Sequence, residues 1–114
     1  MICYSSHYRA ELVPDPSYTI GSADNRPCDR IINPDGLGRG DFVKVCRLAV
    51  ERFETGEELQ AVLIGPGTWC VESCAVLEES RLTVLMDRMV IRLSLDTFEV
   101  VCSRRLDVCG SMLA

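Results

Sequence analysis

From Leu59 onward, apolar residues occur in short runs separated by turn-forming residues about every eight to twelve positions. The clearest run is MVIRLSL, residues 89–95, in which the apolar odd positions alternate with residues that include Arg92 and Ser94. Such alternation is typical of a strand with one face in solvent. The neighbouring runs are LQAVLI, CAVLE, RLTVLM and FEVVC. The pattern therefore predicts an antiparallel meander of at least about four strands within residues 57–103.

Residues 42–53, FVKVCRLAVERF, are open to two interpretations. Asp41 is suited to be an N-cap, and the apolar residues that follow it share one helical face, which indicates a single helix. In the alternative, the helix ends near Cys46, and a strand at 48–54 pairs with residues 58–64 across a Thr-Gly turn. We favour the short helix because the later strands need partners.

Residues 1–40 differ from the rest of the chain because they hold four of the five prolines and half of the eight glycines. Proline fixes φ and glycine permits positive φ, so these residues indicate turns. We interpret residues 1–40 as an irregular arm, 41–103 as a core of helix plus β-meander, and 104–114 as a loosely held tail. Together, the 114 residues suit a single domain.

The expected fold class is α+β and mainly β. Short strands separated by turns, with one short helix, predict a small antiparallel barrel-like or strongly bent sheet of about five or six strands.

Composition and charge narrow the classes of function. Hydrophobic residues make up 47% of the chain and charged residues 25%, which is ordinary for a globular protein. The net charge is −5, and residues 41–103 hold eleven acidic residues against six basic ones. This balance disfavours nucleic-acid binding and is compatible with a basic protein partner. No apolar run reaches the roughly 18 residues of a membrane helix, so no membrane contact is expected.

The number and spacing of the cysteines indicate the cellular compartment of the protein. There are seven, an odd number, in spacings that form no familiar disulfide framework, and we recognise no signal peptide. Most lie inside apolar runs, as Cys46, Cys74 and Cys102 do, where a free cysteine behaves as a small buried hydrophobe. We therefore expect reduced thiols and a cytoplasmic location.

Two pairs with equal spacing, Cys3 with His7 and Cys70 with Cys74, could together form a zinc site of three thiolates and one imidazole. In an extended strand, however, residues four apart are separated by about 13 Å, too far to share one ion. His7 is also the one histidine that could activate a cysteine nucleophile, but no local motif supports that pair. We predict no catalytic residue, metal or cofactor. A zinc- or thiol-dependent small enzyme, or a metal-stapled domain, is the alternative.

Two pairs of carboxylates, Glu57–Glu58 and Glu78–Glu79, lie at expected turns. They form either solvated turns or an acidic lip that recognises arginine or lysine of a partner. Trp69 follows the Gly-Pro-Gly break, where a tryptophan either contacts a partner or closes the end of a barrel. Trp69, Glu57, Glu58, Glu78 and Glu79 are therefore the candidate partner-binding residues.

Three stretches, DFVKVCRLAV, TGEELQAVLI and VIRLSLDTFEVV, resemble in that order the Rof family, small bacterial inhibitors of Rho-dependent termination. The resemblance covers about residues 41–101. It implies an Sm-like barrel after one helix, no enzymatic activity, and binding to the RNA-binding domain of Rho through acidic and polar residues. The chain departs from the family at the Cys-Asp-Asp-Tyr-Asp opening, which PCDRIINPDG, residues 27–36, only echoes.

The function expected from these features is that of a non-enzymatic binding or regulatory protein acting through a protein partner. One version is an inhibitor of a basic or nucleic-acid-binding target such as Rho, and another is an immunity-type or phage-type inhibitor. A structural homo-oligomer is a further alternative, because the edge strands of an incomplete barrel pair readily.

Overall fold

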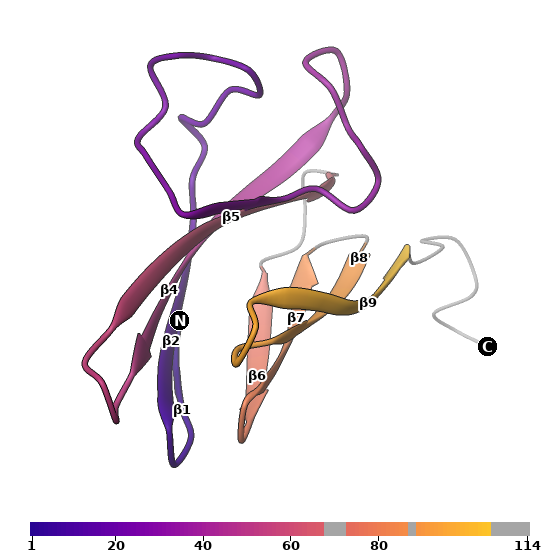
Figure 1. Cartoon of the computed structure of the whole chain (residues 1–114). Helices are drawn as coiled ribbons and strands as arrows, with labels where there is room; N and C mark the ends of the chain where they lie inside the picture. The colour runs from indigo at the N-terminus through magenta and orange to yellow at the C-terminus, as the bar shows by residue number, and fades with distance from the viewer. Residues whose placement is uncertain (68–72, 87–88, 106–114) are drawn as a thin grey trace, which may run out of the picture.

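The computed structural model describes residues 1–67, 73–86 and 89–105, and these residues form nine β-strands and no helix (Figure 1). Five strands make one sheet in the order β1-β2-β4-β5-β3, and four make a second in the order β6-β7-β8-β9. All neighbours are antiparallel except β3 and β5, which are parallel. The strands are β1 (Ile2–Tyr4), β2 (Tyr8–Pro14), β3 (Arg30–Ile32), β4 (Val43–Arg52), β5 (Glu58–Pro66), β6 (Cys74–Glu78), β7 (Arg81–Met86), β8 (Met89–Ser94) and β9 (Glu99–Arg105).

The α+β prediction is wrong, because the described residues are all-β and neither sheet closes into a barrel. Residues 42–53 hold no helix and instead supply β4. The error has a physical reason: β4 is covered on both faces over part of its length and its charged residues fall on both faces, so a period of two is hard to see. The alternative hairpin was right about the pairing, since Leu48 lies opposite Ala61 and Glu51 opposite Glu58.

The irregular arm also needs correction, because residues 1–40 contain β1, β2 and β3. β2 pairs with β4 over seven positions, from Tyr8 opposite Arg52 to Pro14 opposite Cys46. The proline- and glycine-rich segments between β2 and β3 and between β3 and β4 contain no strand.

The predicted meander is confirmed for β6 to β9, which pair in sequence order. In β8 the side chains of Met89, Ile91 and Leu93 are buried, whereas Arg92 is exposed. β5 belongs to the other sheet, and residues 87–88, which connect β7 to β8, lie outside the described residues.

The two sheets share one hydrophobic core. Its buried side chains are Tyr8, Ala10, Leu12, Ile32, Cys46, Leu48, Val50, Ala61 and Leu63 from the first sheet side, and Leu82, Val84, Met86, Met89, Ile91, Leu93, Leu95 and Phe98 from the second. A smaller core lies on the opposite face of the first sheet, where Val45, Val62 and Ile64 are covered by side chains that include Tyr18 and Leu37. The first sheet is therefore covered on both faces over part of its length.

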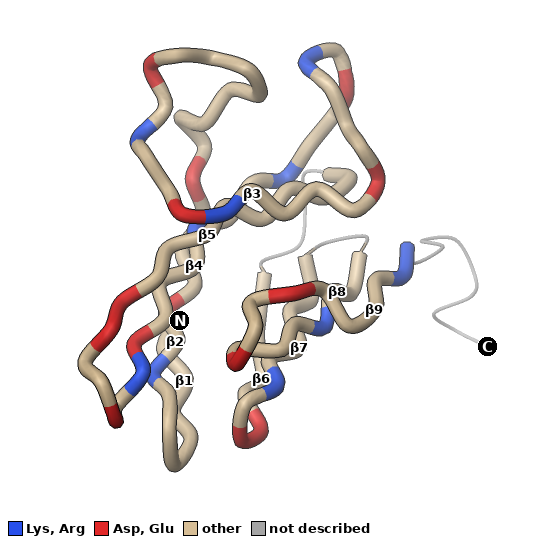
Figure 2. The backbone as a smooth tube through the Cα atoms, viewed as in Figure 1, with Lys and Arg blue, Asp and Glu red and all other residues tan. Residues whose placement is uncertain are grey.

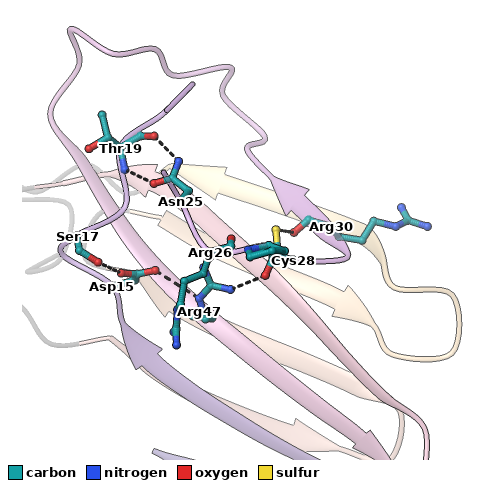
Figure 3. Close-up of polar contacts among 9 residues, drawn as sticks. Asp15, Ser17, Thr19, Asn25, Arg26, Cys28, Arg30 and Arg47 are labelled. Carbon is teal, nitrogen blue, oxygen red and sulfur yellow. Dashed lines mark hydrogen bonds and ion pairs between the residues drawn. The ribbon is translucent and has the colours of Figure 1, made fainter. Parts of the chain in front are cut away.

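The side chain of Arg47 holds the segment between β2 and β3 against this face of the first sheet (Figure 3). It lies on the middle strand, β4, and is only 5% exposed. Its Nε is 3.4 Å from Oδ2 of Asp15, and its terminal nitrogens donate to the carbonyl oxygens of Pro27 at 3.2 Å and Arg26 at 3.3 Å. Burial alone would raise the pKa of Asp15, but hydrogen bonds from Ser17 and Arg47, with the Arg47 charge, lower this pKa below its usual value.

Polar contacts also join the two sheets along one side, where β1 lies beside β6. The Cys3 thiol donates to the carbonyl oxygen of Ala75 at 3.4 Å, and the backbone N–H of Ala75 donates to the sulfur of Met1 at 3.0 Å. The Ser5 hydroxyl donates to the carbonyl oxygen of Glu79 at 2.7 Å. Side chains of β1 and of the turn that follows it therefore satisfy backbone groups of β6 and of the next turn.

Gly67 packs against the backbone of β4, which gives the first testable prediction. A Cβ at this position would lie 2.9 Å from the backbone nitrogen of Lys44 and 2.9 Å from the carbonyl carbon of Val43. We expect Gly67→Ala to lower the free energy of unfolding by about 1–3 kcal/mol, as overpacking does. Gly40→Ala is the control, because no atom lies within 4 Å of its Cβ. Urea denaturation of both variants checks this, and equal midpoints would contradict it.

The buried ion pair gives the second prediction. Arg47→Met should lower the free energy of unfolding by about 3 kcal/mol near neutral pH, because it leaves the Asp15 carboxylate without its charged partner. The exposed pair between Arg105 and Asp35, at 2.8 Å, provides the control, and Arg105→Met should cost less than about 1 kcal/mol.

The pH dependence of the Arg47→Met defect follows from the lowered pKa of Asp15. A carboxyl whose pKa is depressed by folding contributes stability above its unfolded pKa and loses that contribution as the pH falls through the folded pKa. The gap between wild type and Arg47→Met should therefore shrink on acidification. A gap in unfolding free energy that stays constant between about pH 7 and about pH 3 would contradict this assignment.

Candidate functional site

Four turns meet at one end of the sandwich around a cavity of about 280 Å³. They connect β1 to β2, β4 to β5, β6 to β7 and β8 to β9, and Figure 1 shows the first three at the lower end of the view. The cavity is lined by His7, Tyr8, Arg52, Glu54, Glu79, Ser80 and Asp96. Three of these side chains are carboxylates and one is an arginine, so the cavity is acidic.

The floor of the cavity is a polar network that links the two sheets. The Tyr8 hydroxyl donates to Oδ1 of Asp96. The Arg52 guanidinium lies 5.6 Å from the centroid of the Tyr8 ring and donates to the carbonyl oxygens of Asp96 at 3.2 Å and Leu95 at 3.4 Å. A guanidinium over an aromatic face is favourable because the ring quadrupole attracts the cation.

The same contacts shift two pKa values. Hydrogen bonds from Tyr8 and Ser80, followed by the charge of Arg52, hold the pKa of Asp96 below its usual value. Burial raises the pKa of Tyr8, and the hydrogen bond to Asp96 raises it further. At neutral pH the floor is therefore an ionised carboxylate that accepts hydrogen bonds from a neutral phenol.

The rim consists of His7, Glu54 and Glu79. Nδ1 of His7 is 3.7 Å from Oε1 of Glu54, and both side chains are exposed. Glu79 has a φ of 54°, in the left-handed region that costs energy for a residue with a side chain. The hydrogen bond from Ser5 to the Glu79 carbonyl helps to hold that conformation. The rim carboxylates face solvent and are free to accept a donor from outside.

The structure brings the two predicted acidic pairs to the same end of the molecule (Figure 2). Glu57 and Glu58 lie where the β4–β5 turn enters β5, and Glu78 and Glu79 lie where β6 turns into β7. Only Glu79 of these four lines the cavity. Trp69 lies outside the described residues, so its role stays a prediction.

Sequence reasoning missed Tyr8, Arg52, Glu54, Ser80 and Asp96. Tyr8 and Asp96 are 88 residues apart, so no local motif could join them. The alternation of buried Tyr8, Ala10 and Leu12 along β2 was a usable signal for an inward-facing tyrosine. Arg52 lies opposite Tyr8 in the β2–β4 pairing, and the expectation of an irregular arm at residues 1–40 concealed that neighbour.

The cysteine and histidine residues considered for zinc are placed differently from one another. Cys3 contacts Ala75, Cys74 is exposed, and His7 lies beside Glu54. Within the described ranges, no three His, Cys, Asp or Glu side chains are grouped so that they could hold a metal ion. Cys70 falls outside those ranges. The five cysteines that the structure describes are free thiols: Cys3, Cys28, Cys46, Cys74 and Cys102.

Comparisons of the chain with models of known protein families, with curated proteins and with solved structures give no match. The resemblance to the Rof family stays a prediction, and the helix that it implies is replaced by β4. In the part of the chain that the structure describes, no helix has the length and apolarity needed to cross a membrane. The function must therefore be inferred from the chemistry of the acidic end.

The network in the cavity floor gives the third prediction. Tyr8→Phe removes a hydrogen bond to the Asp96 carboxylate, so the pKa of Asp96 should rise toward its usual value. An NMR titration of the aspartate carboxyl carbons would measure the change. Tyr18→Phe is the matched control, because Tyr18 packs on the other face of the first sheet. An Asp96 pKa that is the same in wild type and Tyr8→Phe would show that this bond does not form in solution.

Proposed function

We propose that this chain is a non-enzymatic protein-binding domain whose acidic end receives an arginine or lysine side chain of a partner protein. The observation that carries the proposal is the convergence of four turns around one cavity with three carboxylates and one arginine. Glu57 lies in one of these turns, and Glu58 and Glu78 lie at the strand ends next to them, so they add negative charge at the same end of the molecule. Carboxylates in this arrangement complement a guanidinium or an ammonium group.

The size of the cavity supports a side chain rather than a small-molecule ligand. Its volume of about 280 Å³ lies at the small end of the roughly 300–1,000 Å³ of ordinary ligand pockets and suits a single long side chain. The rim residues His7 and Glu54 are exposed, so a single ion pair here would contribute only about 0.2–1 kcal/mol. In this proposal the acidic end supplies orientation and a fast association rate, and further contacts supply the rest of the affinity.

The biological role that follows is regulation of a basic target by covering the surface that the target uses. A protein that binds nucleic acid through arginine and lysine side chains belongs to this class of target, and Rho would be one example. A cytoplasmic location is part of the proposal and is supported by the five free cysteines that the structure describes.

The test uses N-acetyl-arginine amide, with N-acetyl-citrulline amide as a neutral isostere. In an NMR titration of the labelled full chain, the arginine compound should shift the backbone amides of His7 and Ser80, with an affinity on the order of millimolar. The citrulline compound should not, because it carries no charge. This is the fourth prediction.

A matched pair of double variants makes the result specific. Glu54→Gln with Glu79→Gln removes both rim charges and should abolish the shifts. Asp24→Asn with Glu99→Gln removes two exposed charges that do not line the cavity and should leave the shifts unchanged. Equal binding of the two amides, or binding that survives the loss of the rim charges, would reject the proposed site.

A further inference from the structure

The outer face of the first sheet is divided into two parts. The segments between β2 and β3 and between β3 and β4 cover the part built around Val45, Val62 and Ile64 (Figure 1). Among the described residues, the part nearer the acidic end has no such cover beyond its border at Gln60, where Asp29 forms hydrogen bonds with the Gln60 backbone, and we name this part the open half. Its side chains are Ile2, Tyr4, Arg9, Glu11, Ala49, Glu51, Glu58 and Gln60, which share one face by strand register and burial.

The open half exposes apolar side chains next to one another. Tyr4 is 65% exposed and Ile2 45%, and they lie on the same face of the edge strand β1. Phe53 follows β4 directly, is 45% exposed, and donates its backbone N–H to the His7 carbonyl at 2.9 Å. Exposed apolar side chains that gather on one face indicate an interaction surface, and tyrosine is enriched among residues that dominate binding energy.

The charge of the open half selects the kind of partner. Three carboxylates stand here against one arginine, and Arg9 is 4.0 Å from Glu11. Glu51 and Glu58 have no ion pair among the described residues. Register places Arg9 opposite Glu51, and Glu51 opposite Glu58, so the two carboxylates are neighbours. An acidic surface beside Tyr4 complements a partner that is both basic and apolar.

Other occupants fit less well. Nucleic acid would meet three carboxylates here and one cation, Arg9, which already lies 4.0 Å from Glu11. A second copy that used the same face would place like charges opposite one another. The outer face of the second sheet is less acidic. It exposes Arg81, Arg92 and Arg104 on adjacent strands, with Glu78 and Glu99 on the same face by register.

We propose that the open half is the docking surface for a basic protein segment that carries at least one large apolar side chain, with Tyr4 as its main anchor. The inference takes from the proposed function that the partner is basic. It adds the place where most of the contact area lies. The segment crosses from the acidic cavity onto β1, β2 and β4, and its apolar side chain packs on Tyr4 and Ile2 while its cations reach Glu51 and Glu58.

The test, which is the fifth prediction, uses the peptide Ac-GRGWGRG-NH2 and the labelled full chain. The peptide should shift backbone amides of β1, β2 and β4, and Ac-GEGWGEG-NH2 should not. Tyr4→Ala should weaken peptide binding about fivefold or more, as loss of an anchor does. Phe42→Ala is the matched aromatic control, because Phe42 is 89% exposed outside the open half. Glu51→Gln, which keeps the size of the side chain, provides a second variant of the surface and should also weaken binding.

Two results separate this inference from the function on which it rests. The peptide Ac-GRGGGRG-NH2 lacks the apolar anchor, so its binding should differ less than about twofold between wild type and Tyr4→Ala. N-acetyl-arginine amide should still bind the cavity of Tyr4→Ala. Suppose that the amide binds Tyr4→Ala, but that Ac-GRGWGRG-NH2 binds elsewhere or is no more sensitive to Tyr4→Ala than to Phe42→Ala. The proposed docking surface is then wrong, and the proposed cavity site is retained. If the amide does not bind the cavity while binding of the peptide still depends on Tyr4, the proposed cavity site is wrong and the proposed docking surface is retained.

Discussion

The buried guanidinium of Arg47 is the interaction on which the arrangement of the surfaces depends. A charged group at 5% exposure is stable only when it has hydrogen-bond partners, and Asp15 with the carbonyls of Arg26 and Pro27 accepts one hydrogen bond from each of its three nitrogens. All three partners belong to the segment between β2 and β3, so satisfying Arg47 holds that segment on the outer face of the first sheet. The cover reaches only part of the face, and this leaves the open half and the acidic end exposed to a partner.

The same cover explains which parts of the fold could be predicted from the sequence. Residues 89–95 have one buried and one wet face, so their alternation was clear and the strand was predicted correctly. β4 is covered on one side by the shared core and, around Val45 and Arg47, on the other side by the segments between β2 and β4, and its charged residues fall on both faces. A strand without a wet face loses its period of two, and the helical interpretation then fits equally well.

The candidate site was accessible to sequence reasoning only where it depends on local chemistry. Glu57–Glu58 and Glu78–Glu79 are turn carboxylates between apolar runs, and such positions can be located without a structure. The cavity itself depends on Tyr8 meeting Asp96, which requires both sheets to be assembled, and on Arg52 lying over the Tyr8 ring, which requires β2 to pair with β4. Long-range pairing of this kind leaves no motif in the sequence, because each residue is ordinary in its own segment.

The uneven distribution of charge over the molecule supports both proposed surfaces. A net charge of −5 attracts a basic partner but does not orient it. Orientation comes from the contrast between the acidic end with its open half and the outer face of the second sheet, where three exposed arginines outnumber Glu78 and Glu99. Within the Debye length of roughly 8 Å at physiological salt, a basic partner is attracted more strongly to the first surface than to the second. Exposed ion pairs add little affinity, so a complex steered in this way needs an apolar contact at its centre, and Tyr4 is the exposed aromatic residue that the open half offers.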